Sequence, residues 1–279
     1  MKKIALISDD ICSLPPCVIR EFEIEIVKTK MSFPEWEEWP ERNIYKVIKE
    51  TKKIPKTAAP SPGDFLKAYQ KLKDNSEKIL VITVSARLSG VFNSAFSAKE
   101  LFEDPSKIFL FDSGSAVAGE GLTVLRAAEL IKEGKEIEEI LKELESLKKK
   151  VKFFAFLKTL FWARKTGRVL IWQKLSFDIL KIFGVTPYLG IREGEIKFFG
   201  FNIWTFNQLN AIFNQLKREA KKGKIRVGIN YTDNIEFALR LKERIEKELK
   251  VKVSFFSSVP LIVGAVTGPG TLILACHNL

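Results

Sequence analysis

The chain has 279 residues and a mass of 31.8 kDa, with 46% apolar and 29% charged residues. This composition is typical of globular proteins and excludes general disorder, and no stretch approaches the ~20 consecutive apolar residues of a membrane-spanning helix. The net charge of +12 is uneven, because residues 1–150 hold 25 basic and 25 acidic side chains whereas residues 151–279 hold 21 and 9. The second half also holds 14 of the 22 phenylalanines. We therefore expect two domains with different roles, residues 1–150 and 151–279.

The rarity of histidine and cysteine excludes several kinds of chemistry. His277 is the sole histidine, so a histidine-based triad, a histidine metal site and histidine general-base catalysis are not expected. Cys12, Cys17 and Cys276 match neither a disulfide framework nor a zinc-binding spacing. The apolar run at residues 4–7 is too short for a secretory signal peptide. We expect a soluble, cytoplasmic protein without a metal or a cofactor.

Strand and helix patterns alternate along the first half. Buried strands are predicted at residues 3–8, 23–30, 78–85 and 107–112. Helices are predicted at residues 64–73, 89–101, 122–132 and 137–150. The first of these follows Ser61, an N-cap residue, and Pro62, which suits the first helical position. Such alternation favours a Rossmann-like α/β domain with a parallel sheet.

The pattern changes after residue 150. Strands are predicted at residues 151–157, 225–231, 251–257 and 271–276. Helices are predicted at residues 159–165, 172–182, 205–222 and 234–249. Residues 185–201 are typical of a hairpin whose turn lies at residues 192–195. A hairpin combined with crossover helices predicts a second α/β domain with a mixed sheet.

Hydroxyl side chains are concentrated in the loops that follow the predicted strands. These loops are residues 8–15, 85–90 and 112–115, and residues 56–63 form a further hydroxyl-rich stretch. In an open parallel sheet, ligands bind at the carboxyl ends of the strands. A serine or threonine in such a loop is more often a helix cap or a turn brace than a ligand contact. Together, however, the loops could bind an anionic or polar head group, although neither a dinucleotide fingerprint nor a P-loop is present.

Six segments resemble the DegV family in their order and spacing. They are Ser8-Asp9-Asp10, Thr57-Ala58-Ala59-Pro60-Ser61-Pro62, Ser85-Ala86-Arg87-Leu88-Ser89-Gly90-Val91, Asp112-Ser113-Gly114-Ser115-Ala116-Val117-Ala118-Gly119-Glu120-Gly121, Thr166-Gly167-Arg168 and Val266-Thr267-Gly268-Pro269-Gly270. Each segment alone is a weak signal, whereas six in register from residue 8 to residue 270 are specific.

The resemblance implies a non-catalytic protein that binds one long-chain fatty acid. It places the carboxylate at the domain junction and the acyl chain inside the C-terminal domain. It also implies that the carboxylate is presented to a fatty acid kinase related to dihydroxyacetone kinase, where that partner exists. The carboxylate is expected at Thr57 and Ser89, with secondary contacts at Ser85, Arg87, Arg168 and Thr267.

The sequence departs from the family pattern around the expected head group. Val266 replaces a histidine, Ala58 and Ala86 each replace a common hydroxyl residue, and Ala59 replaces a glutamine. A carboxylate that lacks hydrogen-bond donors in a partly dry site costs on the order of a few kcal/mol. Either Arg87 or ordered water compensates for this loss, or the ligand is a less charged or differently shaped lipid.

An acyl chain needs a dry tunnel, in which each buried methylene contributes ~0.8 kcal/mol. The second half is rich in large apolar side chains that could line such a tunnel, although each of them suits an ordinary core equally well. The residues expected to line it are Phe153, Phe161, Phe183 and Ile262.

Two further features leave alternatives open. The basic run is Lys217, Arg218, Lys221, Lys222, Lys224 and Arg226. It is typical of a solvated helix end, but it could also contact an acidic protein or, transiently, an anionic membrane surface. A nucleic-acid partner is not expected, since no recognition motif accompanies the charge. The alternative function is an enzyme that acts on a small phosphorylated or acyl substrate at the serine-rich loops, where Asp112 would be the available carboxylate.

Overall fold

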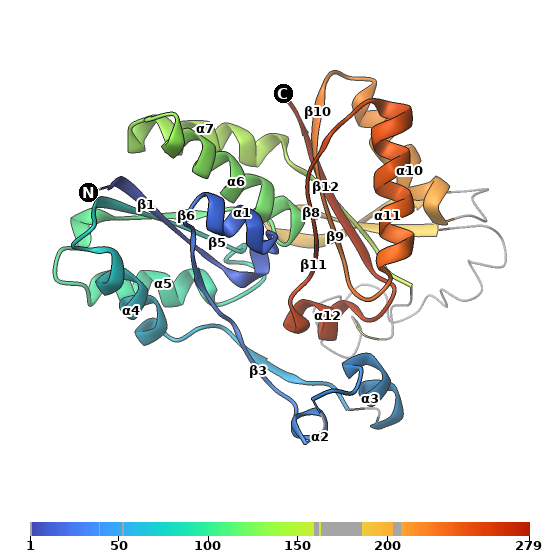
Figure 1. Cartoon of the computed structure of the whole chain (residues 1–279), viewed down its shortest axis with the longest axis horizontal. Coiled ribbons are helices and arrows are strands. Elements are labelled where there is room, and N and C mark those ends of the chain that lie inside the picture. Colours follow the sequence, from blue (N-terminus) through green and yellow to red (C-terminus); the bar gives the residue numbers. More distant parts are fainter. Residues whose placement is uncertain (1, 39, 52, 159–161, 163–185, 203–207) are drawn as a thin grey trace.

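The computed structural model describes residues 2–38, 40–51, 53–158, 162, 186–202 and 208–279. Two sheets lie side by side, and each is flanked by helices (Figure 1). The helices predicted at residues 159–165 and 172–182 cannot be assessed, because apart from residue 162 they lie outside the described residues. No helix in the described part of the chain has the length and apolarity needed to cross a bilayer.

The first sheet is parallel and has the order β2-β1-β5-β6, as the alternating pattern predicts. Its strands are β1 (Lys2–Asp9), β2 (Glu25–Val27), β5 (Ser76–Thr83) and β6 (Ile108–Asp112). The helical elements between and after them are η1 (Asp10–Cys12), α1 (Pro16–Glu21), α4 (Pro62–Leu72), α5 (Val91–Glu100), η2 (Pro105–Lys107), α6 (Ala118–Lys132) and α7 (Ile137–Lys150). Ser61 caps α4 in a capping box with Asp64, which confirms the predicted start of this helix.

Helix α6 begins four residues earlier than its sequence predicts. Gly119 and Gly121 weaken the helical pattern, because glycine disfavours a helix interior. The structure shows why Gly121 is needed: a Cβ there would lie 2.6 Å from the carbonyl oxygen of Cys12. The missing side chain thus lets α6 pack closely against η1.

The chain leaves the first sheet after β2 and forms a small outlying unit. A single strand over residues 23–30 is therefore wrong, because β2 ends at Val27 and β3 (Lys30–Ser32) pairs instead with β4 (Lys56–Ala58). Between β3 and β4 lie α2 (Pro34–Glu37) and α3 (Ile44–Thr51). Phe33, Val47 and Ile48 of this unit pack against Ala265, far along the chain. Figure 1 shows the unit at the bottom, beneath α12.

The second sheet is mixed, with the order β11-β10-β12-β7-β8-β9. Only β10 and β11 are parallel among its neighbouring pairs. Its strands are β7 (Lys152–Phe156), β8 (Thr186–Arg192), β9 (Glu195–Asn202), β10 (Ile225–Tyr231), β11 (Val253–Ser258) and β12 (Leu272–Asn278). Its helices are α10 (Gln208–Ala220), α11 (Ile235–Arg244), a π-helical turn η4 (Ile245–Leu249) and α12 (Leu261–Thr267). The mixed sheet and the β8–β9 hairpin confirm the predictions from the sequence.

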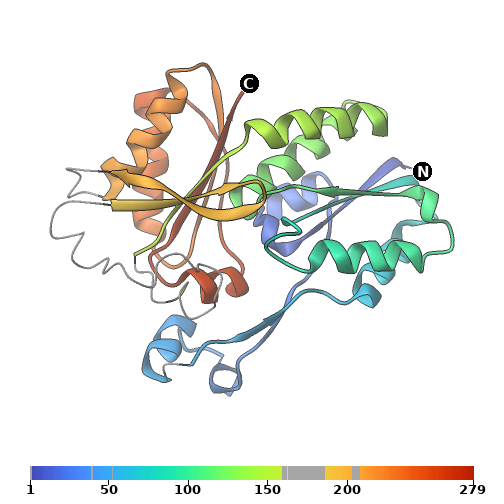
Figure 2. The ribbon, with the colours of Figure 1, turned by 180° about the vertical axis from the view of Figure 1, so that it is seen from behind.

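Helix α6 lies between the two sheets, as both views of the ribbon show (Figures 1 and 2). It contacts β1 and β5 of the first sheet and β7, β10 and β12 of the second. Phe153, Leu189 and Ile273 of the second sheet belong to the same apolar cluster as the first sheet's core. The chain crosses from the first sheet to the second between the end of α7 at Lys150 and the start of β7 at Lys152. A division into domains at residue 150 remains a prediction, and the shared core couples the two parts.

Candidate ligand-binding site

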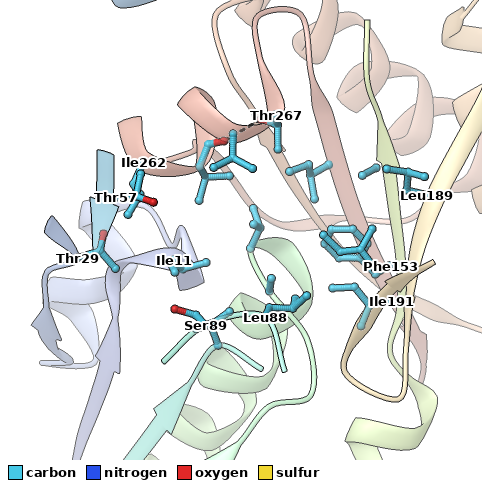
Figure 3. Close-up of a pocket in the computed structure, with 18 of the residues that line it drawn as sticks. Ile11, Thr29, Thr57, Leu88, Ser89, Phe153, Leu189, Ile191, Ile262 and Thr267 are labelled. Atoms are coloured by element: carbon cyan, nitrogen blue, oxygen red, sulfur yellow. Dashed lines mark hydrogen bonds between the residues drawn. The ribbon is translucent and has the colours of Figure 1, made fainter. Parts of the chain in front are cut away.

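A pocket of about 130 Å³ lies between the two sheets, beneath α12. Its volume is roughly ten times the ~10–15 Å³ that one ordered water requires. The wall combines the loops that follow β1 and β5, the β3–β4 ribbon, the inner face of the second sheet, and α12. Figure 3 shows Thr29, Thr57 and Ser89 on one side of the pocket, with the apolar side chains of Ile11 and Ile262 next to them, and the apolar side chains of Phe153, Leu189 and Ile191 on the other side.

The polar side of the pocket carries Thr29, Thr57 and Ser89 (Figure 3). Thr29 is already engaged, because its hydroxyl donates to Asp10 Oδ2 at 3.1 Å. Thr57 lies on β4, and Ser89 immediately precedes Gly90, the N-cap of α5. Both side chains are half-buried, and neither hydroxyl has a hydrogen-bond partner among the described residues. The two predicted carboxylate contacts therefore face one pocket with their donors available.

The backbone around Ser89 also favours negative charge. Gly90 provides no side chain to cap α5, so the first amide groups of this ten-residue helix have no side-chain acceptor at the cap. The unpaired N–H groups and the helix dipole stabilise an anion at this end. A carboxylate near Ser89 would therefore be placed in a favourable field.

The opposite side of the pocket is apolar. Phe153 on β7 and Leu189 and Ile191 on β8 point into it (Figure 3). Ile262 and Val266 of α12 cover the pocket from another side, and both are buried. Phe153 and Ile262 thus lie where the sequence analysis expects chain-lining residues. Phe161 and Phe183, the other two, lie outside the described residues.

Two further contacts are predicted for the head group, Thr267 and Arg168. Thr267 lines the pocket, but its hydroxyl donates to the Val263 carbonyl at 3.0 Å within α12. Arg168 lies outside the described residues. Val266 lines the pocket as a buried side chain and contributes apolar surface there.

Ser85 and Arg87 do not line the pocket; they attach the β8–β9 turn to the first sheet. The hydroxyl of Ser85 is fully buried, donates to the Gly194 carbonyl at 2.8 Å and accepts from the Arg87 N–H at 3.3 Å. The Arg87 guanidinium donates to the Glu193 carbonyl at 3.1 Å and pairs with Glu195 at 3.3 Å. Gly194 has a φ of +78°, and a Cβ there would lie 2.6 Å from Ser85 Oγ. Because the β8–β9 turn approaches the Ser85 hydroxyl so closely, position 194 requires glycine.

The third hydroxyl-rich loop braces its own turn. Asp112 Oδ1 accepts hydrogen bonds from the backbone N–H groups of Gly114 at 2.8 Å and Ala86 at 3.3 Å. The Ser113 hydroxyl accepts from the Ser115 N–H at 3.2 Å. Ser113 and Ser115 are both buried. The simpler interpretation, in which these side chains stabilise turns, therefore holds for Asp112 and Ser113, whereas the buried Ser115 hydroxyl has no hydrogen-bond partner among the described residues.

Several wall residues were not predicted from the sequence. Ile11, Val84 and Leu189 are ordinary apolar residues of a loop or strand, and their position in the wall depends on how the two sheets meet. Thr29 immediately precedes β3, and no local sequence signal marked it as a pocket residue. Only the β3–β4 pairing, which was missed, brings Thr29 and Thr57 to the same pocket.

The basic run at the end of α10 and in the residues that follow it is partly neutralised. Lys222 pairs with Glu219 at 2.8 Å, and Arg226 binds Glu129 of α6 through both terminal nitrogens at 2.6 and 2.9 Å. These ion pairs favour the interpretation of the basic run as a solvated helix end over its interpretation as a binding surface for a polyanion. Among the described residues, no group of three or more histidine, cysteine, aspartate or glutamate side chains could hold a metal ion.

Comparison with known proteins decides the family. The model of the DegV family, whose members are described as uncharacterised, matches residues 3–277. This chain belongs to the DegV family. It is 27% identical to the fatty acid-binding protein of Thermotoga maritima, over 97% of this chain and 96% of that protein.

Solved structures of similar proteins share the fold over the whole chain. A DegV family protein from Thermus thermophilus, studied for its fatty acid binding, superposes with a TM-score of 0.84 at 24% identity, covering 99% of this chain and all of that one. A stearic acid-binding protein from Eubacterium ventriosum superposes with a TM-score of 0.82 at 21% identity, covering all of this chain and 98% of that one. At these identities the structures establish a common fold with a parallel N-terminal and a mixed C-terminal sheet.

Proposed function

We propose that this protein binds one long-chain fatty acid without covalent attachment, with its carboxylate at Thr57 and Ser89 and its acyl chain along Phe153, Leu189 and Ile191. The observation that carries this proposal is the polarity of the pocket, which has two free hydroxyl donors on one side and an apolar wall on the other. The fatty acid-binding relatives support the same ligand class.

The polar and the apolar side of the pocket would each contribute to the binding free energy of a fatty acid. A hydrogen bond to a charged group contributes about 1.5–3 kcal/mol, and the uncapped start of α5 adds to the attraction of the carboxylate. Each methylene transferred from water to the apolar side contributes ~0.8 kcal/mol. Val266 removes one polar partner, so the two hydroxyls would provide a large share of the specificity for the carboxylate.

Mass spectrometry of the purified protein under native conditions, followed by organic extraction, tests the proposal. We expect about one fatty acid per chain, either co-purified or bound on addition of palmitate or oleate. A protein that arrives without lipid and binds neither fatty acid would contradict the proposal. Acyl length and saturation would be read from the same extract.

We further propose that the bound carboxylate is presented to a fatty acid kinase of the dihydroxyacetone kinase type. Thr57 and Ser89 are only half-buried, so a head group beside them would lie near the surface. Mixing the loaded protein with such a kinase and ATP should yield an acyl phosphate, which hydroxylamine traps as a hydroxamate. Absence of the hydroxamate, when a DegV protein known to serve that kinase yields it, would contradict presentation.

Brief contact with an anionic membrane during lipid exchange is a further proposal, and the C-terminal excess of basic residues supports it. Transfer of a fluorescent fatty acid from vesicles should then be faster from anionic than from neutral vesicles. Equal rates would argue against a charge-guided contact.

The alternative of an enzyme at the serine-rich loops has less support. The Ser85 hydroxyl is buried and bonded to the Gly194 carbonyl and the Arg87 N–H, so no base activates it. Asp112 is occupied by two backbone N–H groups. A screen for hydrolase activity that is lost in Ser85→Ala would revive this alternative.

A further inference from the structure

One part of the pocket wall, the β3–β4 ribbon, belongs to neither large sheet in the described part of the chain. Its strand β4 carries Thr57 and pairs with β3, where Met31 lies directly opposite Thr57. An isolated ribbon of two short strands is marginally stable at best, so contacts outside its own ladder must fix it. At the base of the ribbon, Asp10 accepts hydrogen bonds from the N–H and the hydroxyl of Thr29 at 3.0 and 3.1 Å. The far end is attached differently, through the outlying unit.

The outlying unit has an apolar cluster that is separate from the cores of the two large sheets. Its buried residues are Phe33, Ile44, Val47 and Ile48 from the unit, together with Trp162 and Ala265 from farther along the chain. Met31 is partly buried against the same cluster. Because directly opposed residues of an antiparallel pair share one face, the side chain of Met31 lies next to that of Thr57. The cluster therefore reaches the neighbour of a pocket hydroxyl.

Helix α12 has the outlying unit on one face and the pocket on the other. Ala265 is fully buried in the cluster of the unit. A Cβ at Gly264 would lie 2.1 Å from the hydroxyl oxygen of Tyr45, so α12 and α3 approach each other too closely for a side chain at this position. Ile262 and Val266 lie in the pocket wall. Figure 1 shows the unit directly beneath α12.

Packing alone joins the unit to α12. Among the described residues, no hydrogen bond connects residues 30–58 with residues 261–267. The base of the ribbon is held separately, by Thr29 and by the ion pair of Lys30 with Asp64 at 2.6 Å. Truncating a buried side chain leaves a cavity that the surroundings fill only in part. A loss of packing in the cluster should therefore shift the far end of the ribbon while its base stays in place.

We propose that Val47 and Ile48 are positioning residues of the ligand site: by packing the outlying unit on α12 they fix the β3–β4 ribbon and hold the Thr57 hydroxyl toward the fatty acid carboxylate. Neither residue lines the pocket. A hydrogen bond weakens steeply when its donor is misaligned, so a small shift of the ribbon costs affinity without removing the hydroxyl. This inference rests on the proposed fatty acid function.

A double-mutant cycle of Val47→Ala and Thr57→Ala, read out by titration with oleate, tests the inference. Val47→Ala alone should raise the dissociation constant roughly fivefold or more, because the shifted ribbon turns the hydroxyl away from the carboxylate. In the Thr57→Ala background there is no hydroxyl to misplace, so the same substitution should change the constant less than about twofold. A merely structural role of Val47 would cost the same affinity in both backgrounds.

Val227→Ala is the matched control, because Val227 is a buried valine of β10 that belongs to the core of the second sheet and does not line the pocket. The same atoms are removed at a similar burial. This variant should lower the melting temperature of the protein, whereas its dissociation constant for oleate should stay within about twofold of the unaltered value.

A second variant disturbs the same contact without removing any packing. Alanine favours a helix interior more than glycine does, but in Gly264→Ala the new Cβ would meet the Tyr45 hydroxyl and push α12 and α3 apart. Binding of oleate should weaken roughly threefold or more. Adding Tyr45→Phe removes the hydroxyl in the way and should return the affinity to within about twofold of the unaltered protein.

Two sets of results separate this inference from the proposed function. If Val47→Ala weakens binding equally with and without Thr57, or if Val47→Ala and Gly264→Ala both bind oleate like the unaltered protein, the inference is overturned while the proposed function stands. If the unaltered protein binds no oleate, or if Thr57→Ala leaves the affinity unchanged, the proposed head-group site itself fails and the inference fails with it.

Discussion

Two groups of hydroxyl side chains look alike in the sequence and differ in the structure. The bracing hydroxyls, Ser85 and Ser113, are buried and take part in hydrogen bonds to backbone groups. The pocket hydroxyls, Thr57 and Ser89, are half-buried and have no partner among the described residues. A hydroxyl that is already bonded stabilises the fold, whereas an unbonded one beside a pocket is available to a ligand. The following predictions test this difference.

The largest effect is expected from the two pocket hydroxyls together. Thr57→Ala combined with Ser89→Ala should weaken fatty acid binding by about 2–4 kcal/mol, roughly 30- to 1,000-fold, because a charged acceptor loses two donors. The melting temperature of the unliganded protein should hardly change, since no hydrogen bond within the described fold is lost. Calorimetric titration measures the affinity, and an unchanged dissociation constant would place the head group elsewhere.

A change in the β8–β9 turn, which the Ser85 hydroxyl holds, should lower the stability of the fold rather than the affinity for fatty acid. Gly194→Ala should lower the free energy of unfolding by about 2–3 kcal/mol, because an L side chain is strained at a φ of +78° and meets Ser85 Oγ. Gly134→Ala is the matched control, because its φ is +76° and the space around it is open. Equal losses in both variants would show that backbone strain alone, and not the contact with Ser85, is responsible.

Ser85→Ala isolates the hydrogen bond itself. It leaves the Gly194 carbonyl without its donor and should lower the free energy of unfolding by about 1–2 kcal/mol. Fatty acid affinity should change much less than in the Thr57/Ser89 double variant. Denaturant unfolding together with a binding titration checks both parts. A loss of affinity that matches the double variant would erase the distinction between bracing and pocket hydroxyls.

The smallest effect is expected at Val266, the pocket residue at which the resemblance implies a histidine. Val266→His adds a donor to the apolar wall and should tighten binding by about 1 kcal/mol, roughly fivefold, below the pKa of the new imidazole. The gain should shrink as the pH rises and the imidazole loses its charge. Weaker binding at low pH would indicate that the head group lies away from α12.

Much of the fold follows from local pattern. The parallel sheet, the β8–β9 hairpin and the start of α4 at Ser61 depend on alternation, turn chemistry and capping, all of which are visible in short stretches. The early start of α6 was missed because Gly121 disfavours a helix and is explained only by the Cys12 carbonyl that packs against it. The β3–β4 ribbon was missed because three-residue strands carry little pattern.

The site was less predictable than the fold. The resemblance to the DegV family predicts Thr57 and Ser89, which face the pocket, and it also predicts Ser85 and Arg87, which hold the β8–β9 turn. Sequence shows which residues carry donors, but whether a donor is already bonded depends on contacts between distant segments. Buried Asp9, at the end of β1, illustrates this, since nothing local indicates that its carboxylate accepts hydrogen bonds from the backbone N–H groups of both Ile11 and Val84.

The most direct test is a crystal structure of the protein purified with added oleate. We expect one elongated ligand whose carboxylate lies within hydrogen-bond distance of Thr57 Oγ1 and Ser89 Oγ, and whose chain passes Phe153. A pocket filled by the protein's own side chains, or a ligand whose charged end points away from both hydroxyls, would contradict the account.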